Sequence, residues 1–176
     1  RRPQVRDDWH RSPGVTGGIP EMAVEVRALW ARTGIRRWPG RLVLVSLPHS
    51  SLAEATRLIA NAAEGGRARS FAGLVVEEDE VSLTIEDATW SEAAGRIAHN
   101  AVAGPYAAIT LDIDLDLGVC GYLLPAARLL AEAGISIVPQ CGYLKDHLVI
   151  RDADADRAVA ILEGLVAAAS ESVSGA

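Results

Sequence analysis

The 176-residue sequence contains only two cysteines and no long apolar run. Two cysteines are too few for a disulfide framework, and no CxxC pair suggests a zinc ribbon, so reduced thiols are expected. Because no stretch of about 18 or more apolar residues occurs, a transmembrane helix is not expected. The first thirty residues also lack the order of charged, apolar and small residues that is typical of a signal peptide. The expected location is therefore the cytoplasm.

Positive charge is scarce in most of the chain and concentrated at its beginning. Residues 1–41 hold nine arginines against four acidic residues, a net charge of +5, so the rest carries −11 of the total of −6. The acidic body repels phosphate, and the basic segment contains no recognisable nucleic-acid-reading motif. A nucleic-acid partner is therefore not expected. With 49% hydrophobic and 23% charged residues, most of the chain is expected to fold.

Turn signals and apolar periodicity divide the chain into four ranges. Residues 1–40 are predicted to be a basic N-terminal arm, partly disordered, with one short helix between Glu21 and Thr33. Residues 41–103 and 104–170 are predicted to be two modules, and residues 171–176 a tail. In each module the predicted order is strand, helix, strand, strand, helix. These elements cover residues 42–45, 50–64, 71–76, 81–86 and 91–99 in the first module, and residues 106–117, 122–133, 135–138, 148–150 and from 152 onward in the second.

The two predicted modules also share residues at a fixed spacing. Leu83, Ile85 and Asp87 recur 65 positions later as Leu148, Ile150 and Asp152. By the same shift, Leu58 and Ile59 align with Leu123 and Leu124. Together with the common order of elements, this spacing indicates two copies of one supersecondary unit. The predicted fold class is α+β, with two βαββαβ modules whose sheets are antiparallel and carry their helices on one face.

Polar and glycine-rich segments are expected to meet at one end of the second module. In a βαββαβ unit the loop after the first strand lies beside the end of the second strand and the start of the third. Residues 116–122 and 140–145 should therefore converge with Asp146 and His147.

The chemistry of that end suits a zwitterion. Gly118 and Gly121 flank the start of a helix, where unpaired amides and the positive end of the helix dipole can hold a carboxylate. Asp146 can hold an ammonium, so the pair fits a free amino acid. The alternative is that Gly121 only eases a turn and Asp146 only caps a hairpin.

Three stretches of the sequence resemble a known family. Residues 71–83, FAGLVVEEDEVSL, resemble the strand, acidic turn and strand of CASTOR-type tandem ACT proteins. Residues 121–137, GYLLPAARLLAEAGISI, are similar to that family's helix and the leucine-alanine-glutamate-alanine-glycine-isoleucine-serine exit that follows it. Residues 146–150, DHLVI, resemble its aspartate-led third strand. The likeness covers about residues 41–166 and leaves the arm outside.

The resemblance implies ferredoxin-like ACT modules paired side by side, with a small ligand, usually an amino acid, held between modules. It implies no catalysis and no cofactor, and hence a regulatory sensor that binds a free amino acid or a similar small metabolite. The family's ligand-contacting positions match Val119, Cys120, Gly121, Gln140, Cys141, Gly142 and Asp146. Two modules per chain would most readily complete a four-module assembly as a homodimer.

This sequence departs from the family pattern at three of these neighbouring positions. Gln140 and Cys141 stand where the family commonly has a serine and a threonine, which leaves the identity of the amino acid open. Lys145 adds a charge beside Asp146. It either pairs with Asp146, and so weakens the hold of that carboxylate on an ammonium, or receives the ligand carboxylate itself.

Two other classes of protein remain as alternatives. Cys120, Cys141 and His147 would form a metal site or a thiol site if they cluster, although their spacing is not that of conventional ligands. A structural ACT-like dimerisation module without a ligand is the second alternative. The acidic series from Asp112 to Asp116 lacks the glycine and glutamate of a calcium loop, so it is interpreted as the solvated face of a strand.

Overall fold

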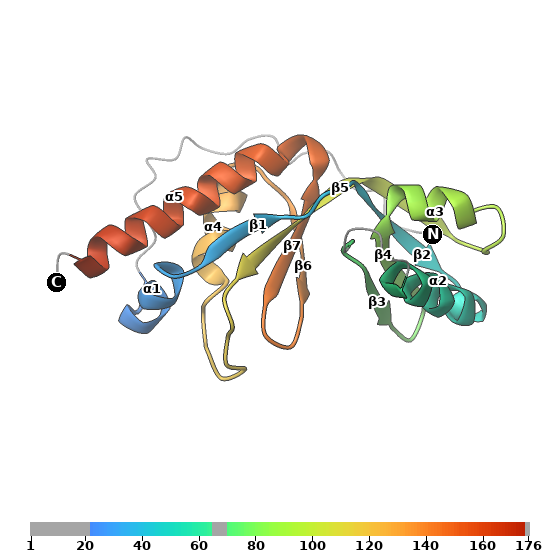
Figure 1. Ribbon diagram of the computed structural model, residues 1–176, viewed down its shortest axis with the longest axis horizontal. Helices are drawn as coiled ribbons and strands as arrows, with labels where there is room; N and C mark the ends of the chain where they lie inside the picture. Colours follow the sequence, from blue (N-terminus) through green and yellow to red (C-terminus); the bar gives the residue numbers. More distant parts are fainter. Residues whose placement is uncertain (1–21, 65–69, 175–176) are drawn as a thin grey trace.

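The computed structural model describes residues 22–64 and 70–174. The first half of the predicted arm, including its expected disorder, lies outside the described residues. Five α-helices and seven strands form in the described part of the chain, joined in places by short 3₁₀ turns (Figure 1). The helices are α1 (Val24–Trp30), α2 (Leu52–Glu64), α3 (Asp87–Ala93), α4 (Leu124–Glu132) and α5 (Ala155–Ser174), and the strands are β1 (Gly34–Arg37), β2 (Leu42–Leu47), β3 (Gly73–Val76), β4 (Val81–Glu86), β5 (Ala101–Asp112), β6 (Ile137–Cys141) and β7 (Asp146–Arg151).

The seven strands form one curled antiparallel sheet. Its order is β3-β4-β2-β5-β7-β6, and β1 pairs with β5 in addition. The long strand β5 belongs to both modules, since Ala101–Tyr106 pairs with β2 and Tyr106–Leu111 pairs with β7. Both modules therefore have the antiparallel sheet, covered by helices on one face, that the sequence predicts, and β5 joins them without a linker (Figure 1).

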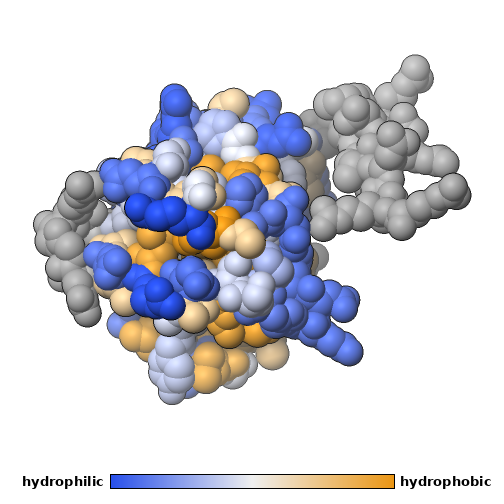
Figure 2. Space-filling view, turned by 90° about the vertical axis from the view of Figure 1, so that its right-hand side faces the viewer, coloured by the Kyte–Doolittle hydropathy of each residue, from blue (hydrophilic) through white to orange (hydrophobic). Residues whose placement is uncertain are grey.

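The first module has a small core between its strands and the helices α2 and α3. Val43, Val45 and Leu47 of β2 and Val81, Leu83 and Ile85 of β4 are all buried, because every second side chain points toward the helices. The buried residues are Val43, Val45, Leu47, Ala55, Val81, Leu83, Ile85, Trp90, Ala93 and Ile97. Figure 2 shows this end of the molecule, where apolar side chains reach the surface between hydrophilic ones. The small module thus covers its apolar residues incompletely.

The second module has a larger core, built from α1, α4, α5 and the strands β1, β5 and β7. Along α5, Ala158, Leu162, Leu165 and Ala169 are buried at the spacing of one helix face. Leu148 and Ile150 of β7 are fully buried, as are Leu83 and Ile85 of β4 at the positions 65 residues earlier.

Part of the predicted arm belongs to this second module. Gly34 pairs with Asp112 and Arg37 with Ile109, so β1 is an edge strand of the sheet. α1 packs against α5 with Trp30 completely buried. The predicted boundary at residues 103 and 104 falls inside β5, and α5 runs through Ser174 into the predicted tail.

Several elements differ from their predicted ranges: β6, for example, is Ile137–Cys141 where a strand was predicted over residues 135–138. The strand predicted over residues 106–117 ends at Asp112, because its partner β7 begins at Asp146 opposite Leu111 and offers no further backbone groups. The helix predicted over residues 91–99 is α3, Asp87–Ala93, which begins directly after β4 with an acidic residue in its first turn. An acidic residue there is favourable for the helix dipole. None of the helices in the described ranges is long and apolar enough to span a membrane.

The two modules meet through a third core on the sheet face that the helices leave open. Phe71, from the segment before β3, packs with Leu42, Ala108 and Val149, and Trp38 lies against the same group. The ring of Phe71 meets Trp38 edge to face at 5.7 Å between centroids. These side chains fill the part of the open face that lies nearest β7.

Candidate functional site

The loop between β5 and α4 and the hairpin between β6 and β7 enclose a cavity of about 380 Å³. Both lie along the same edge of the second module (Figure 1). The lining residues are Leu115, Asp116, Leu117, Val119, Gly121, Tyr122, Leu123 and Leu124 from the loop, and Cys141, Gly142, Tyr143, Leu144, Lys145 and Asp146 from the hairpin. The volume suits a small metabolite.

Backbone hydrogen bonds hold these two segments together. The amide of Leu115 donates to the carbonyl of Leu144 at 2.8 Å, which ties the loop to the hairpin. The amide of Gly142 donates to the carbonyl of Lys145 at 2.8 Å and closes the hairpin turn. Residues 116–122 and 141–146 thus meet around the cavity as predicted, whereas Gln140 and His147, which were predicted to converge with them, do not line it.

Five of the seven residues predicted to contact a ligand line this cavity, namely Val119, Gly121, Cys141, Gly142 and Asp146. Cys120 belongs to the same loop but is exposed, and its thiol donates to the carbonyl of Gly118 at 3.7 Å. Gln140 lies elsewhere. Because successive residues of a strand point to opposite faces, Gln140 points away from its neighbour Cys141 and donates from Nε2 to Oγ1 of Thr84 in the first module.

The loop before α4 is anchored by Tyr122. Its ring stacks on Trp30 at 5.0 Å between centroids, and its carbonyl accepts a hydrogen bond from Nε1 of Trp30 at 2.8 Å. Thr33 Oγ1 donates to the carbonyl of Leu29 and therefore accepts from the Tyr122 hydroxyl at 2.7 Å. Burial raises the pKa of Tyr122 to about 12. The end of α1 and Thr33 after it thus fix the position of a loop that lies about ninety residues later.

This anchored loop leaves several backbone amides free. Gly121 has φ +80°, a conformation that L side chains rarely adopt, and it turns the chain into α4. The amides of Gly118 and Val119 donate to Oδ1 and the carbonyl oxygen of Asp116. Within the described ranges, the amides of residues 120–123 donate to no protein acceptor. These four donors, beside the N-terminal end of a nine-residue helix, favour an anionic group.

The carboxylate of Asp146 lies across the cavity wall from the loop, on the first residue of β7. It is half-buried and opposite Cys141 in the strand register. The neighbouring Asp146 carboxylate raises the pKa of the Cys141 thiol above its ordinary value. Asp146 also adds to the rise in the pKa of Tyr122. Asp146 therefore lines the cavity beside both Cys141 and Tyr122.

Lys145 pairs with other carboxylates than the neighbouring Asp146. Its ammonium bonds Oδ1 of Asp112 and lies 3.3 Å from Oδ1 of Asp114. The hydrogen bond from Lys145 lowers the pKa of Asp112, and the same contact raises the pKa of Lys145. Of the two arrangements considered for Lys145, pairing with Asp146 is therefore not observed, and Asp146 keeps its charge available.

The metal and thiol alternative finds no cluster in the structure. Cys120 and Cys141 are free and exposed. His147 points to the opposite sheet face from Asp146, where its Nδ1 lies 2.9 Å from Oγ1 of Thr110 and its ring meets Phe71 at 5.1 Å. In residues 22–64 and 70–174, no group of three or more histidine, cysteine or acidic side chains is placed to hold a metal ion.

The environment of His147 predicts an acid-dependent loss of stability. Burial lowers the pKa of His147 from its ordinary value of 6.5, and the charge of Arg36 lowers it further. The unfolded chain therefore binds more protons than the folded chain between these two pKa values, so the stabilisation is complete above pH 6.5 and is lost as the pH falls. We expect urea denaturation to show a loss between pH 7.5 and pH 5 that is smaller in His147→Gln. One group contributes at most about 1.4 kcal/mol per pH unit, and equal losses in both proteins would contradict the assignment.

The sequence alone did not identify the residues that build this site from outside the loop. Trp30 and Thr33 fall in the predicted arm, although the helical spacing of Met22, Val26 and Trp30 is a signal for a buried face. That signal gives a helix but not its partner. The sequence therefore predicted most of the residues that line the cavity, but not the residues that hold the loop in place.

Comparison with known proteins finds likeness in structure only. The sequence matches no protein-family model, and no curated protein sequence is significantly similar to it. A Vibrio cholerae protein of unknown function, described as a possible transport protein, superposes with a TM-score of 0.61 at 20% identity over 80% of this chain and 95% of its own. The α and β subunits of an aspartokinase superpose with a TM-score of 0.53 at 17% identity, over 76% and 97%. The regulatory subunit of aspartate kinase from Thermus thermophilus, in its ligand-free form, gives 0.52 at 14% identity, over 76% and 97%.

At these identities the likeness shows the fold and nothing finer. It confirms the predicted α+β architecture of ferredoxin-like, ACT-like modules. The aspartate kinase subunits share the fold that the resemblance to CASTOR-type proteins implied. They do not show that the chain belongs to that branch of ACT proteins. The chain is therefore an ACT-like protein in its fold.

Proposed function

We propose that this chain is a non-catalytic regulatory protein that binds a free amino acid in the cavity of the second module. The carboxylate of the ligand accepts hydrogen bonds from the amides of residues 120–123, and its ammonium pairs with Asp146. One observation carries the proposal: a single cavity of about 380 Å³ is lined both by the amide-bearing loop and by this carboxylate. An anion site and a cation site in one small cavity match the two charges of a zwitterion.

The polar contacts around the cavity support this assignment. Lys145 is occupied by Asp112 and Asp114, so it does not neutralise Asp146. Tyr122 is held by Trp30 and Thr33, so the loop amides keep their direction when the cavity is empty. A preformed site loses less free energy on ordering when the ligand binds. Tyr143 and Leu144 are exposed at the cavity, where they provide apolar contact for a ligand side chain.

The fold supports the regulatory part of the proposal. The structural neighbours include regulatory subunits of aspartate kinase, and we extend the regulatory role to this chain as a proposal. The outer edges of the sheet, β3 and β6, have no partner strand on their outer side within the described residues, and Val76 is exposed on β3. We infer that two chains associate as a homodimer through these edges, with a cytoplasmic location. Light scattering that shows only monomer at high concentration would contradict the dimer.

A thermal-shift screen tests the proposed ligand class. At about one hundred times its dissociation constant, a ligand adds about 2.7 kcal/mol to the stability of the folded state. For a protein of this size, the melting temperature then rises by roughly 5 to 10 °C. We expect at least one of the twenty amino acids to produce this rise.

The matched control is the hydroxy acid with the same side chain, which keeps the carboxylate and lacks the ammonium. We expect it to produce a much smaller rise than the amino acid. If no amino acid raises the melting temperature at 10 mM, the proposed function is wrong. If amino acid and hydroxy acid act equally, the role of Asp146 is wrong.

A further inference from the structure

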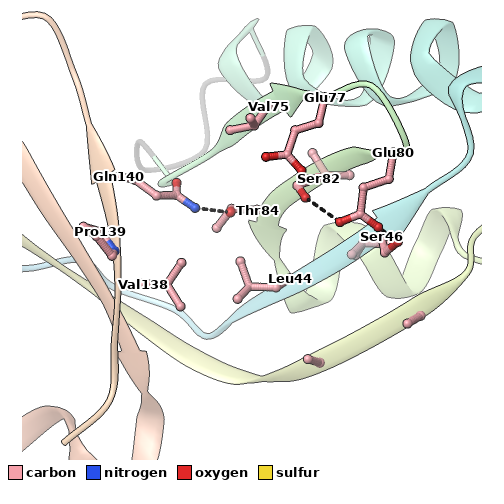
Figure 3. Close-up of a pocket in the computed structure, with 14 residues that line it drawn as sticks. Leu44, Ser46, Val75, Glu77, Glu80, Ser82, Thr84, Val138, Pro139 and Gln140 are labelled. Atoms are coloured by element: carbon pink, nitrogen blue, oxygen red, sulfur yellow. Dashed lines mark hydrogen bonds between the residues drawn. The ribbon is translucent and has the colours of Figure 1, made fainter. Parts of the chain in front are cut away.

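A second cavity lies between the two modules and shares no residue with the first. Its volume is also about 380 Å³, and it is bordered by β2, β3, β4 and β5 of the first module and by Val138, Pro139 and Gln140 of β6 (Figure 3). It occupies the part of the open sheet face that Phe71 and Trp38 do not fill. We call it the inter-module groove. It opens on a different face of the sheet from the amino-acid cavity, because Gln140 and Cys141 point in opposite directions.

Small side chains form the floor of the inter-module groove. Ser46, Ser82, Thr84, Ala101 and Ala103 stand side by side on three neighbouring strands, β4, β2 and β5, where a sheet packed against another layer would carry large apolar residues. The space above these residues therefore exists because their side chains are small, not because the strands lie apart. It has room for a ligand.

The walls of the groove are apolar. Leu44 and Val75 from the first module and Val138 and Pro139 from β6 line it, and Figure 3 shows these side chains around one space. Val75 is 51% exposed and Val138 is 36% exposed, so both have apolar surface that a ligand can cover. An occupant with a short apolar body would remove this surface from water.

One end of the groove carries two carboxylates that no described residue neutralises. The two carboxylate oxygens of Glu80 accept hydrogen bonds from the hydroxyls of Ser46 and Ser82, the second at 3.3 Å, and Figure 3 shows the three side chains together. Glu77 also borders the groove. None of the described residues that line it is basic, and no ion pair to Glu77 or Glu80 exists in the described ranges. Two neutral hydroxyls orient the Glu80 carboxylate without neutralising it.

The other end of the groove is closed by a contact between the modules. Gln140 of β6 donates from Nε2 to Oγ1 of Thr84 in β4, and Thr84 is buried. A Cβ at Gly73 would lie 2.8 Å from Oε1 of Gln140, so the glycine lets this side chain reach across. An occupant of the groove therefore touches both modules and lies beside the contact that joins them.

We propose that the inter-module groove is a second ligand site, which takes an organic cation with a short apolar body and no carboxylate, such as a primary alkylamine. The ammonium pairs with Glu80 between the two serine hydroxyls, and the alkyl chain lies on Leu44, Val75 and Val138. In the groove the carboxylate of a free amino acid would be repelled by the negative charges of Glu77 and Glu80. Free amino acids therefore bind in the other cavity. Bound in this place, the cation stabilises one arrangement of the two modules.

Titration calorimetry with butylamine tests the second site, at low ionic strength and with butyrate as the matched probe of opposite charge. We expect butylamine to bind, butyrate not to bind, and Glu80→Gln to weaken butylamine at least about tenfold, as the loss of a charge-assisted bond predicts. Glu78→Gln, on the exposed turn outside the groove, should leave the affinity unchanged. If butylamine does not bind at 10 mM, or butyrate binds equally well, the proposal is wrong.

A second pair of variants tests the location without removing Glu80. Val138→Lys places a competing cation at the groove wall and should abolish butylamine binding, whereas Val138→Glu should preserve it. Val138 is on an edge strand and partly exposed, so both variants are expected to fold. If Val138→Lys binds butylamine as the wild type does, the ligand is not in the groove. Because the amino-acid cavity contains neither Glu80 nor Val138, failure here leaves the proposed function standing, and the reverse also holds.

Discussion

Replacing Trp30 by alanine should destabilise the folded chain by about 3–5 kcal/mol, the usual cost of truncating a fully buried aromatic residue. Its side chain has no exposed surface, lies in the core with α5, and stacks on Tyr122. The change leaves a cavity and removes the hydrogen bond from Nε1 to the Tyr122 carbonyl. A drop in melting temperature of roughly 10 °C or more is expected from differential scanning calorimetry.

Two further substitutions separate the causes of this effect. Trp30→Phe keeps a ring against Tyr122 but loses the hydrogen bond, so it should cost about 2 kcal/mol, less than the alanine variant. Val24→Ala in the same helix removes a side chain that is 80% exposed and should cost less than about 0.5 kcal/mol. If Trp30→Ala costs no more than Val24→Ala, then α1 is not part of the second module.

Asp146→Asn should weaken amino-acid binding by roughly 30- to 150-fold. The substitution keeps the size of the side chain and removes its charge. A hydrogen bond to a charged group contributes about 2–3 kcal/mol, and this free energy converts to that range of affinity. Titration calorimetry with the amino acid identified by the thermal-shift screen gives the two dissociation constants.

The control for this variant is Asp79→Asn, which makes the same change on the exposed turn between β3 and β4. It should bind as the wild type does. Butylamine should bind Asp146→Asn normally, since the inter-module groove does not contain Asp146. If Asp146→Asn retains the wild-type affinity for the amino acid, the ammonium partner is a different residue.

Local pattern predicted those parts of the fold in which each residue reports its own environment. The strands β4 and β7 lie 65 residues apart along their whole lengths, and the matching leucine and isoleucine residues of both are buried. The buried face of α5 can likewise be predicted from the spacing of its apolar residues. In these elements almost all the buried residues of the structure are apolar residues of the sequence, so burial can be inferred from the local pattern.

Pairing between distant segments was not visible in the same way. β1 is four residues long, three of them exposed, and nothing in Gly34–Arg37 indicates that it pairs with β5. The third core, between the two modules, depends on contacts of Phe71 with residues of β2, β5 and β7, which are far apart in the sequence. Such contacts follow from topology, which a single sequence does not contain.

The candidate site shows the same division. The glycine at position 121 and the carboxylate at position 146 were recognisable because a helix start and a strand start give them a place in a βαββαβ unit. Gln140 was grouped with Cys141 and Gly142 because the family resemblance matched all three to ligand-contacting positions, and strand alternation turns Gln140 away from Cys141. The groove was missed because Ser46, Ser82 and Thr84 are ordinary strand residues until the pairing of β2 with β4 brings them together.

The most direct test of the proposed function is an NMR titration of the uniformly ¹⁵N-labelled chain with the amino acid that stabilises it. We predict that the largest amide shift changes occur at residues 119–123 and 141–146, the two segments that line the cavity. The amides of residues 44–46 and 82–84 in the inter-module groove should change little. Shift changes that leave residues 119–123 unaffected would contradict the claim that these amides hold the ligand carboxylate.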